Sequence, residues 1–439
     1  MVDRVVILGA GISGVGAAIL ARKQGFIVFI SDNNPIKKKH KNILEKHQVE
    51  WEEGKHTLDK MLNASEIIVS PGIPEDSGII IDLKKYNVSI ISEIEFAFRY
   101  TNARIVAITG SNGKTTTTLL LGHILKKAGF DVLIAGNVGV SFSASIALRD
   151  YQYIVLEISS FQLERIKGFR SELAIILNIT PDHLDRYSNS FEKYVATKFK
   201  ITKNQTESDF LIYNIDSKTV SKVKTNAKKI PISLHKYVPE GAFMENNNIK
   251  INLNNKNMTI QELALQGKHN AFNCMAAAVA ARVFEVKDSI IRQSMIDFQN
   301  VEHRLEYVLT VHGIDFINDS KATNINACWY ALESMHKDVI WIAGGVDKGN
   351  DYSQIQDLVE EKVKSIVCLG ESNTNIISAF SKKVDSIVNA LDMKDAIKQA
   401  YNIANKGEVV LLSPACASFD LFKNYEDRGL QFKQEVRNL

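Results

Sequence analysis

A glycine-rich turn in the first third of the chain has the residue types that hold a nucleoside triphosphate. Gly110-Ser111-Asn112-Gly113-Lys114-Thr115 lies between an apolar run, 105–108, and a leucine-rich stretch that predicts a helix. Glycines leave backbone N–H groups open to phosphate oxygens, the lysine supplies a cation, and the threonine hydroxyl can bind magnesium. Ile108 stands where the common P-loop pattern has its first glycine, so the motif is a variant. The alternative, an ordinary turn with an exposed lysine, leaves the four threonines after Lys114 unexplained.

Two further polar residues follow apolar runs of the same region. Glu157 ends the run 153–156, and His183 lies shortly after the run 173–177. P-loop proteins hold magnesium with an acidic residue at such a strand end, whereas an isolated glutamate would serve as an ion-pair partner or helix cap. His183 can bind or polarise a ligand, or it can be a hydrogen-bonded structural histidine.

Lys198 falls on the apolar stripe of a predicted helix that Ser190 caps. The stripe consists of Phe191, Tyr194, Val195 and Ile201. Burial favours the neutral amine, which is the form that reacts with carbon dioxide or serves as a base. The alternative is that the side chain reaches out to water.

Strands and helices alternate around these residues, which predicts an α/β protein of three domains for a chain of 439 residues. We expect a Rossmann-like N-terminal domain, a central P-loop-type mononucleotide-binding domain and a C-terminal Rossmann-like α/β domain. Their predicted bounds are 1–93, 94–299 and 300–439.

The N-terminal unit has a dinucleotide-type fingerprint. A strand over 4–8 runs into Gly9-Ala10-Gly11-Ile12-Ser13-Gly14, and a second strand ends at Asp32. This pattern indicates binding of phosphate and sugar, while a tight turn without a ligand is the alternative. Ser70 ends another predicted strand of the same sheet, at the edge where ligands of open α/β sheets gather.

The C-terminal unit places small and charged residues after its predicted strands, among them Lys321, Lys348 and Ser418. Such an edge suits a small anionic substrate, although each lysine alone could be a solvated loop residue. Between the central motifs and this unit, the Asn- and Lys-rich stretch 225–257 predicts a peripheral β excursion without chemistry.

Composition excludes several classes of protein. With 53 basic and 50 acidic residues the chain has no strong field, so we expect no binding to nucleic acid or to a membrane surface. Its four cysteines are scattered without a CxxC pair, which argues against a disulfide framework or a zinc site and favours the reducing cytoplasm. Glycines interrupt the N-terminal apolar run, and no stretch is long enough to span a membrane.

Taken together, the motifs resemble the Mur ligases of peptidoglycan synthesis, most of all the D-glutamate-adding members, along essentially the whole chain. The variant P-loop with Ile108 is a feature of that family. The segments that carry the resemblance are 109–115, 157–164, 181–185, 267–270, 318–324 and 413–420.

The resemblance implies an ATP-dependent amide ligase acting on UDP-N-acetylmuramoyl-L-alanine and D-glutamate. ATP would phosphorylate the free carboxylate of the UDP substrate, and the amine of D-glutamate would displace phosphate. The resemblance also implies two magnesium ions, a carbamylated Lys198, and a cytoplasmic enzyme, which we expect to be a monomer. In this family the N-terminal fingerprint holds uridine phosphates and not a nicotinamide cofactor.

The resemblance also implies roles for individual residues. Catalysis is expected of Lys114, His183 and Lys198. Metal binding is expected of Thr115, Glu157, His183 and Lys198. ATP binding is expected of Gly110, Ser111, Asn112, Gly113, Lys114, Thr115, Thr116, Asn273, Arg304 and Asp319. Binding of the UDP substrate is expected of Ile12, Ser13, Asp32, Asn33, Ser70, Asn137, Ser159 and Gln162. Binding of D-glutamate is expected of Lys321, Thr323, Lys348, Ser418 and Tyr425.

Three other functions remain open from the sequence. Another amide ligase, such as a different Mur ligase or a folylpolyglutamate synthase, would share the ATP chemistry but not the amino acid. An NAD-dependent dehydrogenase would account for the N-terminal fingerprint and leave Lys114 and Lys198 without a role. A non-enzymatic nucleotide-binding protein would require an inactive metal site, although Glu157 and His183 are both present.

Overall fold

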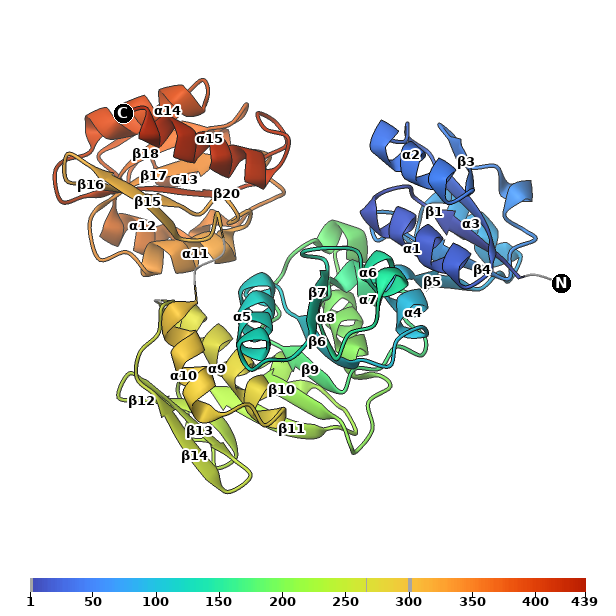
Figure 1. The fold of residues 1–439 in the computed structure, drawn as a ribbon. Coiled ribbons are helices and arrows are strands. Elements are labelled where there is room, and N and C mark those ends of the chain that lie inside the picture. The colour runs from blue at the N-terminus through green and yellow to red at the C-terminus, as the bar shows by residue number, and fades with distance from the viewer. Residues whose placement is uncertain (1–2, 266, 299–301) are drawn as a thin grey trace. The chain divides into compact units, whose positions relative to one another are not determined.

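A computed structural model describes residues 3–265, 267–298 and 302–439 of the chain (Figure 1). It contains three β-sheets in two compact units. The first unit comprises Met1–Leu263 and Phe272–Asp297, and the second comprises Ala264–Ala271 and Phe298–Leu439. Within the described residues no helix combines the length and the apolar character needed to cross a membrane.

The N-terminal sheet has five parallel strands in the order β3-β2-β1-β4-β5. Alternate residues of β1 face opposite sides: Val5 and Ile7 join one apolar core, and Val6 and Leu8 join another. Both faces are therefore covered by helices, as the fingerprint predicted. The elements are β1 (Arg4–Leu8), α1 (Ile12–Lys23), β2 (Ile27–Asp32), α2 (Lys38–Lys46), β3 (Glu50–Glu53), η1 (Leu58–Lys60), β4 (Glu66–Val69), α3 (Gly78–Lys85) and β5 (Ile90–Ser92).

The central sheet has nine strands in the order β14-β13-β12-β11-β10-β9-β6-β8-β7. Neighbouring strands from β7 through β8, β6, β9, β10 and β11 to β12 run parallel, and the pairs β12–β13 and β13–β14 are antiparallel. Its strands are β6 (Arg104–Thr109), β7 (Val132–Gly136), β8 (Tyr153–Glu157), β9 (Leu173–Ile176), β10 (Phe210–Asn214), β11 (Lys228–Ser233), β12 (Gly241–Glu245), β13 (Asn248–Leu253) and β14 (Lys256–Ile260). Its helices are α5 (Lys114–Lys127), α6 (Phe142–Leu148), α7 (Ser160–Leu163), η2 (Leu184–Tyr187), α8 (Phe191–Phe199), η3 (Lys200–Thr202), η4 (Val220–Lys222), α9 (Lys268–Val283) and α10 (Asp288–Asp297).

The stretch 225–257 forms β11, β12 and β13 toward one edge of the central sheet, which confirms the predicted peripheral strands, but these strands belong to the main sheet itself. β11 continues the main parallel sheet through β10, a strand that the sequence analysis did not predict. β10 escaped notice because it is a short apolar run among polar residues. The hairpins of β12 to β14 then extend the same sheet to its edge.

The second unit holds a six-stranded sheet in the order β15-β16-β20-β17-β18-β19. Only the pair of β15 and β16 is antiparallel among its described strand pairs. Trp341 and Ile340 on β17 belong to different apolar cores, so helices cover both faces here too. The elements are β15 (Glu306–Val311), β16 (Ile314–Asn318), α11 (Ile325–Glu333), β17 (Val339–Gly344), η5 (Tyr352–Ile355), α12 (Gln356–Lys362), β18 (Val363–Leu369), α13 (Thr374–Phe380), β19 (Ser386–Ala390), α14 (Met393–Ile403), β20 (Val409–Ala415) and α15 (Tyr425–Arg437).

The N-terminal and central sheets are joined by α4 (Glu93–Phe98) within the first unit. The buried carboxyl of Glu93 accepts hydrogen bonds from Ser141 Oγ at 3.1 Å and Ser143 N at 2.7 Å. Burial raises the pKa of Glu93, so its neutral form is favoured. The predicted domain bounds stay predictions.

Replacing Gly16 by alanine should destabilise the packing of α1 on α6. A Cβ at Gly16 would lie 2.0 Å from Ser141 Oγ, and Ser141 caps α6. We expect the free energy of unfolding to fall by about 2 kcal/mol, because overpacking forces backbone or side chains to shift. Urea unfolding measures the change. Gly78→Ala is the control, since no atom lies within 4 Å of its Cβ position and its stability should not fall.

Candidate active site

The predicted phosphate loop connects β6 to α5, and its shape requires glycine at position 113. Gly113 has φ 83°, and a Cβ there would lie 2.3 Å from Asn273 Oδ1. The structure therefore brings Asn273 next to the loop, as its predicted role in ATP binding requires. Lys114 Nζ donates to the carbonyl oxygens of Gly110 at 2.8 Å and Ser111 at 2.9 Å.

Residues that follow β9 hold the phosphate loop from the other side. Ser111 Oγ donates to the carbonyl of Thr180 at 2.9 Å, and Asn112 N donates to Asn178 Oδ1 at 2.8 Å. The loop is thus fixed by hydrogen bonds to a neighbouring strand end. Asn178 and Thr180 were not predicted as functional residues, although they belong to the polar exit of a predicted strand.

Glu157 ends β8 beside the phosphate loop, because it pairs with Ile108 of β6 in the parallel ladder. Its carboxylate is buried, with the side chain of Asn137 donating to Oε1 at 2.7 Å. No hydrogen bond reaches Oε2 from the described residues, although this oxygen is buried. A buried carboxylate oxygen without a partner is what a cation site needs.

Lys198 points inward, so the prediction from the apolar stripe is confirmed and the alternative of a side chain reaching water is wrong. The residue is 2% exposed, and its Nζ donates to the Gly110 carbonyl at 2.9 Å. Nζ also lies 4.8 Å from the centre of the Tyr194 ring. Burial lowers the pKa of Lys198 well below its usual value, and the charge of Lys114 lowers it further.

His183 is the N-cap residue of the short helix η2 and has a left-handed backbone, φ 51°. Its ring lies 5.1 Å from that of Phe161, and its Nε2 lies 3.7 Å from Asp182 Oδ2. Its side chain is 39% exposed, so a ligand can reach it. The charge of Asp182, the residue before His183, also acts on Lys198. His183 and Lys198 therefore lie at the same end of the central sheet.

The donor set fits magnesium. Among the described residues no cluster of three or more His, Cys, Asp or Glu side chains could hold a metal alone. Magnesium does not need one, since it keeps several waters and binds through one or two carboxylates together with substrate phosphates. Glu157 and the hydroxyl of Thr115 are hard oxygen donors of the required kind.

Five of the eight residues predicted to bind the UDP substrate lie at the carboxyl ends of β1, β2 and β4, namely Ile12, Ser13, Asp32, Asn33 and Ser70. Asp32 accepts from Ala10 N at 2.7 Å, and Ser70 Oγ donates to the Gly9 carbonyl at 3.2 Å. Ile12 is 65% exposed at the start of α1, which leaves it open to a ligand. Ser13 and Asn33 are adjacent to these residues in the chain.

Ser159 and Gln162 lie at the start of α7, directly after β8. They form a capping box, with Ser159 N donating to Gln162 Oε1 at 2.9 Å. Their side chains therefore stabilise the helix start that follows Glu157. Thr116, in the first turn of α5, is fully buried.

In the second unit Lys321, Lys348 and Ser418 follow β16, β17 and β20, which are neighbours in the sheet. The structure thus brings them to one edge, as predicted. Lys321 Nζ lies 5.4 Å from the centre of the Tyr425 ring. Thr323 is half-buried in the same loop as Lys321.

Arg428 was missed by the sequence analysis although it connects these three strand ends. Its guanidinium is buried and donates to the carbonyls of Ser320 at 2.9 Å, Cys416 at 3.3 Å and Gly344 at 3.5 Å. Burial lowers its pKa to about 10, which keeps the side chain charged at neutral pH. An arginine in an amphipathic helix, α15, carries no sequence signal for this role.

Arg304 and Asp319 both belong to the second unit. Asp319 is buried and accepts from Ser413 Oγ at 2.9 Å and Leu305 N at 3.2 Å. Burial raises its pKa to about 7, although the charge of Arg304 opposes the shift.

Asp319 should therefore make the second unit less stable as pH rises from about 4 to about 7. Over this range the unfolded carboxyl ionises while the folded one keeps its proton, so the stabilisation present below pH 4 is lost. The loss should be on the order of 4 kcal/mol. Urea unfolding at several pH values, compared with Asp319→Asn, measures it. The same pH slope in both proteins would contradict the assignment.

Three domain families match the chain in order. They are the MurD N-terminal domain over residues 4–79, the Mur ligase middle domain over 108–281, and the Mur ligase, glutamate ligase domain over 303–416. The "UDP-N-acetylmuramoylalanine--D-glutamate ligase" of Christiangramia forsetii is 50% identical over 445 residues, which cover 100% of each chain. The chain belongs to the Mur ligase family.

A second relative and a solved structure agree with membership of the Mur ligase family. The protein of the same name from Bacteroides thetaiotaomicron is 49% identical over 442 residues, covering 99% of this Mur ligase and 100% of that protein. A solved pseudomurein peptide ligase type C from Methanothermus fervidus has a TM-score of 0.63 at 18% identity, covering 99% of each chain. That likeness shows the fold alone. This Mur ligase has the three-domain α/β fold and ATP-dependent chemistry of its family.

Proposed function

We propose that this Mur ligase adds D-glutamate to UDP-N-acetylmuramoyl-L-alanine at the expense of ATP, in the synthesis of peptidoglycan precursors. The observation that carries the proposal is the identity of about one half, along the whole chain, with ligases named for this reaction. Phosphate loop, Glu157 and Lys198 lie together in the structure, as such chemistry requires.

The first step activates a carboxylate. The phosphate loop holds the triphosphate of ATP, with Lys114 against its outer oxygens. The carboxylate of the UDP substrate attacks the terminal phosphorus, and an acyl phosphate and ADP result. Asn137, Ser159 and Gln162 orient the muramoyl part, while the UDP part binds the residues Ile12, Ser13, Asp32, Asn33 and Ser70.

Two magnesium ions would neutralise the negative oxygens that crowd together in this step. Thr115 and Glu157 would hold one ion, and His183 and carbamylated Lys198 the other. Carbamylation needs a neutral amine, which the depressed pKa of Lys198 supplies. The amine nitrogen bonds to the carbon of carbon dioxide and releases a proton, and the lysine then presents two carbamate oxygens in place of a neutral amine.

The second step forms the amide. The amine of D-glutamate attacks the acyl phosphate, and inorganic phosphate leaves. Lys321 and Lys348 would pair with the carboxylates of D-glutamate, and Thr323, Ser418 and Tyr425 would complete its site. Asn273, Arg304 and Asp319 would contact the adenosine side of ATP.

Phosphate release tests the function. The protein is incubated with ATP, magnesium and UDP-N-acetylmuramoyl-L-alanine, and each candidate amino acid is added in turn. We expect release with D-glutamate and little with L-glutamate or meso-diaminopimelate. Release that needs neither the UDP substrate nor an amino acid would reject the proposal.

We also propose that the enzyme is a cytoplasmic monomer. All four cysteines are free and buried, which suits a reducing compartment. Sedimentation at several protein concentrations tests the oligomeric state, and a concentration-dependent rise in mass would contradict it.

A further inference from the structure

Two arginines bind the backbone of the loop 70–73, which carries Ser70. Arg186 donates from Nη1 to the carbonyl of Pro71 at 2.7 Å and from Nη2 to that of Ile73 at 3.2 Å. Arg165 Nη2 donates to the same Ile73 carbonyl at 3.1 Å. The loop belongs to the N-terminal sheet, whereas both arginines follow strands of the central sheet.

Contacts with Glu164 and Phe161 fix the position of the Arg186 side chain. Its Nε and Nη2 donate to the two carboxylate oxygens of Glu164 at 3.2 and 2.9 Å, and the two side chains are 11% and 7% exposed. Its guanidinium carbon lies 4.1 Å from the centre of the Phe161 ring, which also contacts His183. A bidentate pair of this kind fixes the plane of the guanidinium.

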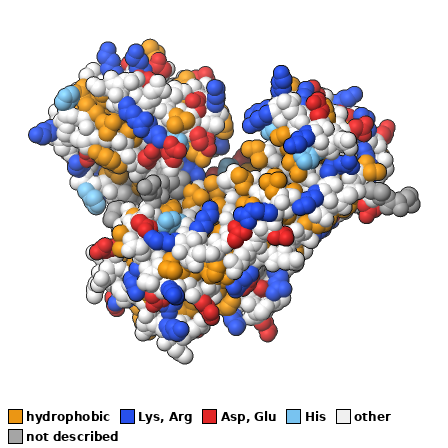
Figure 2. Space-filling model, viewed as in Figure 1, with side chains coloured by type: hydrophobic (Ala, Val, Ile, Leu, Met, Phe, Trp, Pro, Cys, Tyr) orange, Lys and Arg blue, Asp and Glu red, His pale blue; other side chains and the backbone are white. Residues whose placement is uncertain are grey.

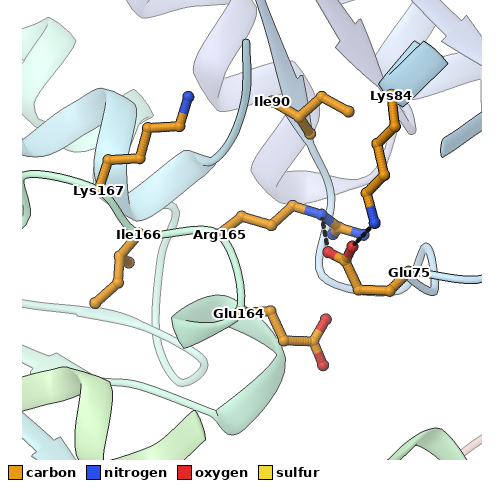
Figure 3. A pocket seen from close by; sticks show the side chains of 7 residues that line it. All are labelled: Glu75, Lys84, Ile90, Glu164, Arg165, Ile166 and Lys167. Carbon is orange, nitrogen blue, oxygen red and sulfur yellow. Dashed lines mark hydrogen bonds and ion pairs between the residues drawn. The ribbon is translucent and has the colours of Figure 1, made fainter. Parts of the chain in front are cut away.

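Arg165 is anchored less firmly. Figure 3 shows Arg165 and Lys84 pointing to the carboxylate of Glu75. The nitrogen–oxygen distance of each ion pair is 2.6 Å. A pocket of about 220 Å³ opens beside this group, and the side chains of Glu75 and Lys84 are 43% and 54% exposed. Water therefore weakens these ion pairs, and Arg186 is the firmer of the two contacts.

The other side of the loop touches the glycine-rich turn. Ser70 Oγ donates to the Gly9 carbonyl, and a Cβ at Gly9 would lie 2.6 Å from Ser70 Oγ. The loop is thus enclosed between the turn at the UDP side and the guanidinium of Arg186. Movement of Arg186 would move Ser70 relative to Gly9.

We propose that Arg186 is a positioning residue that holds the UDP-binding loop 70–73 at a fixed distance from the segment carrying His183. Arg186 lies in η2, three residues after the N-cap residue His183, so one short segment carries both. The inference rests on the proposed function, because it assigns the loop to the UDP substrate. Arg186 contacts the loop backbone, and we do not assign it a contact with the reacting atoms.

The test compares Glu164→Gln with the double variant Arg186→Gln/Glu164→Gln. Glu164→Gln removes the charge pair but leaves both loop hydrogen bonds, so KM for each substrate should stay within about twofold of the wild type. The double variant removes the loop hydrogen bonds without leaving a buried carboxylate unpaired. Its KM for the UDP substrate should rise about tenfold, with KM for ATP and D-glutamate unchanged.

Equal KM values for the UDP substrate in the single and double variants would overturn the inference. If the wild-type protein itself does not turn over these substrates, the proposed function is rejected. The failure of the inference and the failure of the proposed function are therefore distinguishable. If circular dichroism shows that the double variant does not fold, Arg186→Lys is measured. A lysine keeps the charge but cannot donate to two carbonyls in the same geometry, so its KM should rise about threefold or more. An unchanged KM in Arg186→Lys would also overturn the inference.

Discussion

Replacing Lys198 by alanine should lower kcat for ligation on the order of a thousandfold, while ATP still binds. The buried amine lies against the phosphate loop through its hydrogen bond to the Gly110 carbonyl. A neutral amine at this place can become a carbamate, and alanine cannot. Loss of one neutral hydrogen bond costs about 1 kcal/mol, which is too little to release the nucleotide.

The control for this variant is Lys193→Ala, on the same helix α8 but exposed. It should turn over like the wild type. Short carboxylates such as formate should partly restore the Lys198→Ala enzyme, since they bring back two oxygens. Wild-type turnover in Lys198→Ala would refute the carbamate, and wild-type mass spectra taken under carbon dioxide should show the added group.

Glu157→Gln should lower kcat by a similar factor, on the order of a hundred- to a thousandfold, and raise the magnesium concentration for half-maximal rate. The amide oxygen can still accept from Asn137, so the local structure is kept. What disappears is the negative charge of the buried oxygen Oε2, which has no hydrogen-bond partner among the described residues.

Glu93→Gln is a matched control, because Glu93 is an equally buried glutamate of the same unit. Burial already favours its neutral form, and an amide oxygen can accept from Ser141 and Ser143. We expect wild-type magnesium dependence in this variant. A Glu157→Gln enzyme with unchanged magnesium dependence would mean that Glu157 holds no cation.

The sequence alone predicted the parts of this protein that depend on local pattern. The glycines of the phosphate loop, the strand that ends at Glu157 and the inward direction of Lys198 all follow from spacing and periodicity. The dehydrogenase alternative also depended on a local pattern, because a glycine-rich turn after a strand can bind several kinds of nucleotide. Family membership decides between the ligase and the dehydrogenase, because the similarity to ligases extends over the whole chain.

Contacts between distant segments could not be predicted. Arg186 and Pro71 are 115 residues apart, and Arg428 reaches Ser320 across 108 residues. Neither arginine belongs to a motif whose spacing shows its partner. Carbonyl acceptors leave no trace in the sequence, since every residue has one.

Arg428 has a consequence for how new amino-acid specificity could arise. Its guanidinium binds the backbone carbonyls of Ser320, Gly344 and Cys416, and one side chain, the hydroxyl of Ser320 at 3.0 Å. Apart from Ser320, it therefore depends little on which side chains those loops carry. Lys321 directly follows the anchored Ser320, and Ser418 lies two residues after the anchored Cys416. Selection could therefore exchange the residues proposed to bind the amino acid while the loop backbones keep their places.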